Sequence, residues 1–244
     1  WTVGSDGSTR ALHLSSSDHN WSVGASAPVP PTPLGRVTIG TKDYPLTTLR
    51  AVPQETDVFE ATYGESGVTA RLRISPEADA IIVELLTLSG PRPTRLQLVS
   101  VPVSIEENVG SKLVVRWNTE AAFCLVPLSD RIEARSDGGA LTAILHAEFG
   151  FEGQKVALLG TKPSDFYAAI EAIERRFGLP CPTLDGQWAK TSEDARTSYF
   201  FFDLKPDNVK ECIRLAKLGG FKYILIYTTT WSWSRGTYSL HPKN

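Results

Sequence analysis

The spacing of apolar residues changes near Gly160, and this change constrains the fold more than any other feature of the 244-residue sequence. Before it, short runs alternate between apolar and polar residues, as between Val68 and Ile74, which is the period of a strand with one buried face. Gly, Pro, Asp and Asn separate the runs, as turn geometry requires. Many short strands without helices between them predict an antiparallel β-sandwich over residues 1–160.

Residues 164–178 have the period of a helix instead. Four large apolar residues are spaced by four, three and four positions and would share one helical face: Phe166, Ile170, Ile173 and Phe177. Ser164 is a candidate N-cap, and Gly178 is a candidate stop. The helix belongs to a predicted helical linker over residues 161–190, whose later part, LPCPTLDGQ, is rich in turn residues.

Residues 191–244 predict a strand, a helix and a second strand. The aromatic run TSYFFFDL is followed by KPDNVKECIRLAKLGGF, which has Val209, Cys212, Ile213 and Ala216 on one helical face, and then by KYILIY. A continuous apolar run such as KYILIY is typical of a strand buried on both sides. The predicted fold class is therefore mixed: an antiparallel β-sandwich, a linker helix and the first β-α-β unit of a (β/α) barrel. The remaining barrel strands are expected beyond Asn244.

Composition argues against several classes of function. The net charge is −2, and basic and acidic residues are interspersed, so a nucleic-acid-binding surface is not predicted. No run of 18 apolar residues that could cross a membrane occurs. The three cysteines and four histidines are scattered, so neither a metal site nor a cofactor is predicted, and His13 and His146 are interpreted as structural residues. A first residue other than Met leads us to expect that a leader was removed.

The run FFDLKPDNVKECIRLAKLGGFKYILIYTTTWSWSRGTYSLHPKN resembles the opening of the catalytic barrel in α-galactosidase-like retaining glycoside hydrolases. LAKLGGFKYILIY is similar to the helix and strand of that pattern, and Trp231 or Trp233 is similar to its loop tryptophan. The resemblance implies a secreted or periplasmic enzyme that cleaves glycosidic bonds in oligo- or polysaccharides by acid-assisted, carboxylate-dependent hydrolysis. It also implies that the remainder of the barrel, including the catalytic carboxylates, lies beyond Asn244.

Five residues of the last segment are candidate substrate-binding residues. Trp231 and Trp233 would face the same way on an extended chain and form a platform for a sugar ring, although either could be an ordinary core residue. Arg235 and Tyr238 could hydrogen-bond hydroxyls or the carboxylate of an acidic sugar, or simply be solvated. Asp203 follows a predicted strand and could reach the site, or cap the next helix.

The alternative function is a non-catalytic carbohydrate-binding or interaction module, in which the sandwich binds glycan and the βαβ unit is a docking element. This hypothesis requires a strip of exposed aromatic residues on the sandwich. The candidates do not follow one regular spacing: Trp1, Trp21, Tyr44, Tyr63 and Trp117. A purely structural sandwich is a third possibility, because a fold does not determine a function.

Overall fold

A computed structural model of the chain describes residues 1–22, 32–77, 80–110, 113–193, 199–202, 205, 207–221 and 223–226. The chain divides into two compact units, Trp1–Leu179 and Pro180–Asn244. Within the described ranges, no helix is long and apolar enough to cross a membrane.

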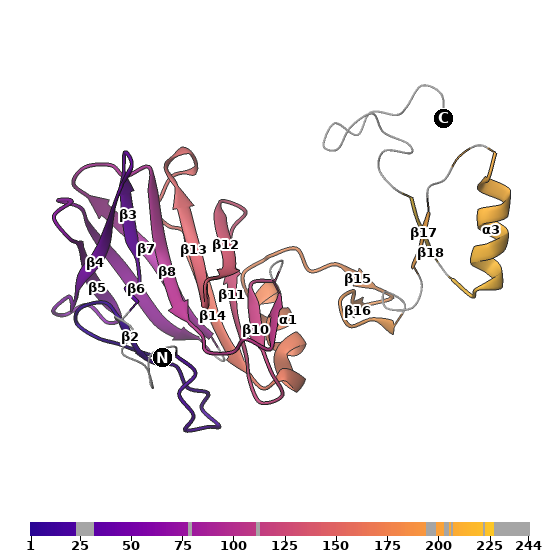
Figure 1. Ribbon diagram of the computed structural model, residues 1–244, viewed down its shortest axis with the longest axis horizontal. Coiled ribbons are helices and arrows are strands. Elements are labelled where there is room, and N and C mark those ends of the chain that lie inside the picture. The colour runs from indigo at the N-terminus through magenta and orange to yellow at the C-terminus, as the bar shows by residue number, and fades with distance from the viewer. Residues whose placement is uncertain are drawn as a thin grey trace. The chain divides into compact units, whose positions relative to one another are not determined.

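The first unit is built around one antiparallel sheet of 12 strands (Figure 1). The order across the sheet is β12-β13-β8-β3-β4-β5-β6-β7-β14-β11-β10-β9. In chain order, the strands of this sheet are β3 (Arg36–Ile39), β4 (Lys42–Ala51), β5 (Val58–Tyr63), β6 (Thr69–Glu77), β7 (Ala80–Ser89), β8 (Arg95–Pro102), β9 (Asn108–Gly110), β10 (Val115–Trp117), β11 (Ala122–Pro127), β12 (Ile132–Asp137), β13 (Ala140–His146) and β14 (Lys155–Thr161). Two further strands, β1 (Thr2–Val3) and β2 (Thr9–Ala11), pair with each other.

The prediction of a β-sandwich built from separate sheets is wrong, because the sheet is continuous and curls back on itself. Strand β4 makes the link: its first half pairs with β3, up to Pro45, and its second half pairs with β5, from Leu46. The register shifts between Leu46 and Thr48, at the point where β4 changes partner. Strand β11, near one end of the strand order, contacts β12 and β13 at the other end, so the sheet is nearly closed into a barrel.

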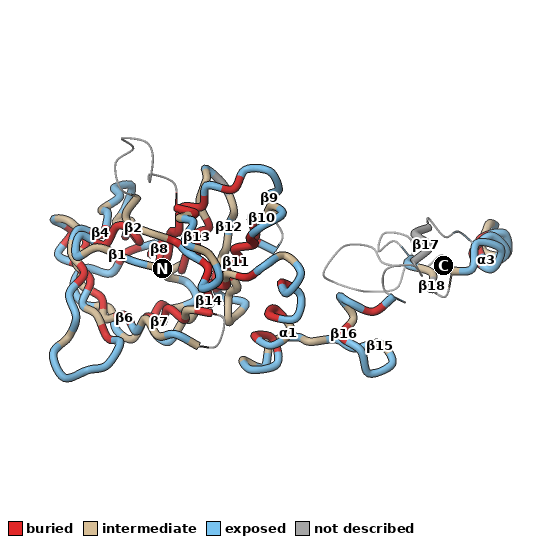
Figure 2. Tube along the Cα trace, turned by 90° about the horizontal axis from the view of Figure 1, so that it is seen from below, coloured by how far each residue is buried: buried red, intermediate tan, exposed pale blue. Residues whose placement is uncertain are grey.

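The predicted alternation explains how the sheet encloses its core. Val68, Ala70 and Leu72 are buried, as the period of two predicts, and Ile74 packs against the same core. Strand β8 is buried along almost its whole length. Buried residues are concentrated on the strands of the large sheet (Figure 2).

The predicted linker helix is present as α1 (Phe166–Arg176) and lies in the first unit. Phe166, Ile170 and Ile173 are buried, as their spacing predicts, and α1 contacts β14. The predicted N-cap is wrong: a 3₁₀ helix, η2 (Pro163–Asp165), precedes α1, and Asp165 occupies the N-cap position without a side-chain capping bond. Gly178 has a φ of 64°, a left-handed conformation that suits glycine at the end of a helix. A second 3₁₀ helix, η1 (Ala147–Phe149), follows β13.

The second unit contains a short hairpin of β15 (Thr183–Leu184) and β16 (Gln187–Trp188). It also contains β17 (Tyr199–Phe202), α3 (Val209–Leu218) and β18 (Tyr223–Ile226), with β17 and β18 paired in parallel. On α3, Cys212 and Ala216 are buried, whereas Ile213, predicted to lie on the same buried face, is 42% exposed.

The prediction that this segment begins a (β/α) barrel is also wrong. Leu225 and Ile226 of β18 are 47% and 39% exposed, whereas the strands of such a barrel are covered on both faces. Apart from the β15–β16 hairpin, the described residues of this unit form a two-stranded parallel sheet with one connecting helix, and this arrangement is not the start of a closed barrel.

Candidate functional site

The five substrate-binding residues predicted from the sequence lie outside the described residues: Asp203, Trp231, Trp233, Arg235 and Tyr238. Their roles stay predictions. The candidate site therefore lies in the first unit, where the structure describes hollows and the side chains that line them.

The site is organised around a turn at residues 14–17. Leu14 is buried and anchors the turn, and the Ser17 amide donates a hydrogen bond to the Leu14 carbonyl at 3.1 Å. Ser15 and Ser16 lie at the exposed tip, where serine is favoured because its hydroxyl can bond to nearby backbone. The turn presents hydroxyl groups beside β14 and α1.

Three hollows adjoin this turn and share Leu14, and we call them together the 14–17 groove. The central hollow, of about 360 Å³, is lined by Leu14, Ser15, Ser16, Gly160, Thr161, Lys162, Asp165, Ala168, Ala169 and Ala172. The Trp1 hollow, of about 200 Å³, is lined by Trp1, Leu12, His13, Leu14, Ser15, Pro76, Ala80, Ile81, Phe123, Leu158 and Gly160. The Trp21 hollow, of about 400 Å³, is lined by Leu14, Ser16, Ser17, Trp21, Thr119, Glu120, Lys162, Pro163 and Ser164.

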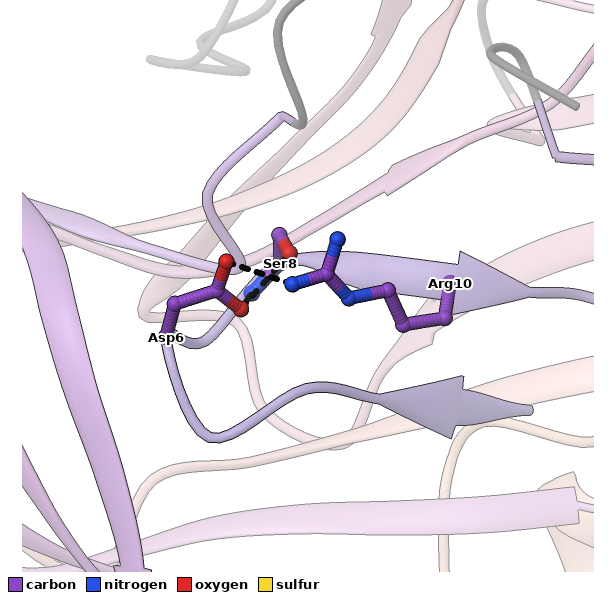
Figure 3. Close-up of polar contacts among 3 residues, drawn as sticks. All are labelled: Asp6, Ser8 and Arg10. Carbon is purple, nitrogen blue, oxygen red and sulfur yellow. Dashed lines mark hydrogen bonds and ion pairs between the residues drawn. The ribbon is translucent and has the colours of Figure 1, made fainter.

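Trp1 is held in place by the hairpin of β1 and β2. Its Nε1 donates a hydrogen bond to Thr9 Oγ1 at 3.2 Å. The turn between the two strands is closed by Asp6, whose carboxylate accepts bonds from the Ser8 hydroxyl at 2.7 Å and from Arg10 Nη2 at 2.6 Å (Figure 3). The Ser8 hydrogen bonds, and then Arg10, lower the pKa of Asp6. The half-buried indole of Trp1 is thus anchored by its polar atom.

Gly160 allows the central and Trp1 hollows to meet. It lies opposite Phe123 in the pairing of β14 with β11. A Cβ atom at this position would lie 2.9 Å from Phe123 Cε1 and 3.1 Å from Leu14 Cδ2. Any side chain here would therefore crowd the groove at its floor.

Trp21 forms the buried wall of the Trp21 hollow. Its backbone is held on both sides, because its amide donates to the Leu12 carbonyl at 2.7 Å and its carbonyl accepts from the Ser104 amide at 2.8 Å. The ring lies 6.3 Å from that of Phe123, between centroids. Trp21 is only 5% exposed, and its Nε1 has no hydrogen-bond partner among the residues that the structure describes.

The charges around the groove are sparse. Lys162 lines both the central and the Trp21 hollows, and no ion pair links it to a carboxylate in the described part of the chain. Asp165 accepts a hydrogen bond from the Ser164 hydroxyl at 3.0 Å, and Glu120 is exposed at the rim of the Trp21 hollow. The groove is therefore polar and mixed in charge.

The carboxyls whose pKa shifts are resolved lie outside this groove. A carboxyl that acts as a general acid at neutral pH needs a raised pKa. Wherever a shift is resolved for a described carboxyl the pKa is lowered: Asp6, Asp43, Glu107, Glu133 and Glu211. None of these residues lines the 14–17 groove. Burial raises the pKa of the Tyr63 hydroxyl, but this side chain belongs to the core.

Metal ligands are not clustered in the described ranges, where no group of three or more His, Cys, Asp or Glu residues could hold an ion. His146 contacts Glu133 Oε2 through Nε2 at 2.8 Å, so its ring has a partner in the structure. His13 is exposed and lines the Trp1 hollow, with its Nδ1 3.1 Å from the His19 carbonyl oxygen.

Sequence reasoning missed this groove. Its walls come from segments that are far apart in the chain, around residues 1, 14, 120 and 162, and no local spacing connects them. The run of three serines at residues 15–17 is the part of the groove that can be noticed in the sequence.

The chain was also compared with known proteins. No family model, curated protein or solved structure matches it. The resemblance to α-galactosidase-like enzymes accordingly stays a prediction from the sequence.

Proposed function

We propose that this chain belongs to a carbohydrate-processing protein in which residues 1–179 bind sugar without cleaving it, at the 14–17 groove. One observation carries the proposal: the central and Trp1 hollows share Leu14, Ser15 and Gly160, and together they present an anchored indole beside hydroxyl and charged groups.

Sugar recognition requires this combination of surfaces. A pyranose ring has an apolar C–H face that can stack on an aromatic ring, while its hydroxyls need hydrogen-bond donors and acceptors. Trp1 supplies the aromatic ring, with its N–H already bonded to Thr9. Ser15, Ser16 and Lys162 supply donors, and Asp165 supplies an acceptor.

The size of the site fits a small ligand. The two hollows have volumes of about 200 and 360 Å³. Sites for small molecules commonly have volumes of roughly 300–1,000 Å³. This favours recognition of one end or a short stretch of a glycan rather than a long segment of a polysaccharide.

Hydrolysis of a glycosidic bond remains part of the proposal on the strength of the sequence resemblance alone. That reaction needs two carboxyl groups on opposite sides of the bond, one of them protonated at working pH. The proposal gives residues 1–179 a binding role and assigns no catalytic residue to them.

The test is a binding screen with the full chain. We expect a glycan array to yield ligands, and Trp1→Ala to weaken their binding by about two- to tenfold in calorimetry, since an aromatic stacking contact is worth roughly 0.5–1.5 kcal/mol. Phe149→Ala is a matched control, because Phe149 is 49% exposed and lies outside the groove.

Two outcomes would refute the proposal. One is the absence of any glycan ligand for a chain that circular dichroism shows to be folded. The other is a ligand whose affinity is the same in Trp1→Ala and in the unmodified chain.

A further inference from the structure

Lys162 occupies a distinctive position in the groove. It follows β14 directly, precedes η2, and lines both the central and the Trp21 hollows. The side chain is exposed, and the structure pairs it with no carboxylate in the ranges it describes. By contrast, Arg73 and Lys155 are both paired with Glu84. Lys162 is therefore a cation available to a ligand.

Two buried hydrogen-bonding groups beside Lys162 also lack partners in the described structure. Thr161, which lines the central hollow, is 8% exposed, and its Oγ1 is unpaired. Trp21, which lines the Trp21 hollow, has an unpaired Nε1, and an indole N–H can only donate. Both atoms are covered by protein and do not contact a ligand in the groove, so the exposed ammonium group of Lys162 is the donor that a ligand meets at this end.

We propose that the groove selects acidic sugars, and that the anionic group, a carboxylate or a sulfate, binds beside Lys162 at the junction of the central and Trp21 hollows. This inference rests on the proposed function, because it assigns the class of sugar to the same groove. The serine hydroxyls of the 14–17 turn hydrogen-bond the anion or the neighbouring ring hydroxyls. A charge-assisted bond to the ammonium group is the main source of the selectivity.

Two carboxylates oppose such a ligand, Asp165 in the central hollow and Glu120 in the Trp21 hollow, and Glu120 provides a second test. It lies on the rim of the Trp21 hollow, which Lys162 also lines. A carboxylate there repels an anionic sugar and leaves a neutral sugar unaffected. Removal of the Glu120 charge should therefore strengthen the binding of acidic ligands, whereas removal of the Lys162 charge should weaken it.

The experiment is calorimetric titration of the full chain with three probes: a neutral oligosaccharide, the matching uronic-acid oligosaccharide and a sulfated one. We expect the acidic probes to bind more tightly, with an affinity that falls as salt is raised. Lys162→Gln should weaken them by about fivefold, which corresponds to ~1 kcal/mol. Glu120→Gln should strengthen them and leave the binding of the neutral probe unchanged, whereas Lys162→Gln should weaken the acidic probes more than the neutral one.

Lys42→Gln is the matched control, because Lys42 begins β4, is exposed and lines none of the three hollows. It should leave the binding of all probes unchanged. A preference for only one acidic probe would identify the anion as carboxylate or sulfate.

The possible failures are distinct. If all probes bind equally well, or Lys162→Gln weakens the neutral and acidic probes alike, the inference is overturned while the proposed function stands. If no probe binds and the glycan screen is also negative, the proposed function fails and the inference fails with it.

Discussion

Replacement of Gly160 by alanine tests how closely the floor of the groove is packed. The added Cβ would lie 2.9 Å from Phe123 Cε1, 3.2 Å from Phe123 Cδ1 and 3.1 Å from Leu14 Cδ2, closer than ordinary van der Waals contact. The Phe123 ring has little room to withdraw, because the residue is 1% exposed and its ring packs near that of Trp21. Leu14 is also buried, so both neighbours resist displacement.

The net effect can be estimated from two opposing contributions. Overpacking of a dense core costs about 1–3 kcal/mol. Alanine is favoured over glycine within a strand by roughly 0.5–1 kcal/mol, because glycine loses more backbone entropy on folding. We therefore expect Gly160→Ala to lower the free energy of unfolding by about 1 kcal/mol, which would lower the melting temperature by about 2–4 °C for a domain of this size.

The assay is urea denaturation of Gly160→Ala, Phe123→Leu and the double variant. Leucine lacks the Cε1 atom that the new Cβ would meet, so Gly160→Ala should cost less in the Phe123→Leu background. Sugar binding should also weaken, because Gly160 lines both the central and the Trp1 hollows. The prediction would be refuted if Gly160→Ala lowered the free energy of unfolding equally with Phe or Leu at position 123, or if it raised it. Either result would show that the contact with Phe123 does not limit packing.

Two further predictions concern stability. Leu72→Ala removes a fully buried side chain and should lower the free energy of unfolding by about 2–5 kcal/mol in urea denaturation; a loss under about 1 kcal/mol would contradict the packing described for β6. The hydrogen bond with His146, and then Arg135, lowers the pKa of Glu133, so its stabilising contribution should be present above the unfolded pKa of about 4.3 and disappear as pH falls through the lower folded value. Glu133→Gln should accordingly lower the free energy of unfolding, measured by urea denaturation, at neutral pH but not in acid. A loss of stability that is the same at every pH would refute this prediction.

Local features of the fold were predictable because they depend on neighbours in sequence. The spacing of Phe166, Ile170 and Ile173 correctly predicted the buried face of α1, and the alternation from Val68 to Leu72 correctly predicted a buried strand face. Helix ends were less predictable. Ser164 was expected to cap α1, but the 3₁₀ turn η2 moved the start of the helix past it.

The arrangement of strands was not predictable from these patterns. Alternation indicates which face of a strand is buried, but it carries no information on which strands share hydrogen bonds. A strand that exchanges one partner for another at Pro45 and Leu46 has the same pattern as one that keeps a single partner. The apolar run of β18 likewise suggested burial on both faces, yet Leu225 is 47% exposed, because burial depends on which elements cover a strand.

The candidate site shows the same division between local and long-range information. Strand and helix periods, turn residues and the near-neutral charge can be read along the chain, since each depends on residues a few positions apart. The 14–17 groove depends on long-range packing: β14 must lie beside β11 to bring Gly160 against Phe123, and the end of β14 must lie beside the serine turn to bring Lys162 near it. Contacts between residues more than a hundred positions apart arise from tertiary packing, so the groove could be identified only in the three-dimensional structure.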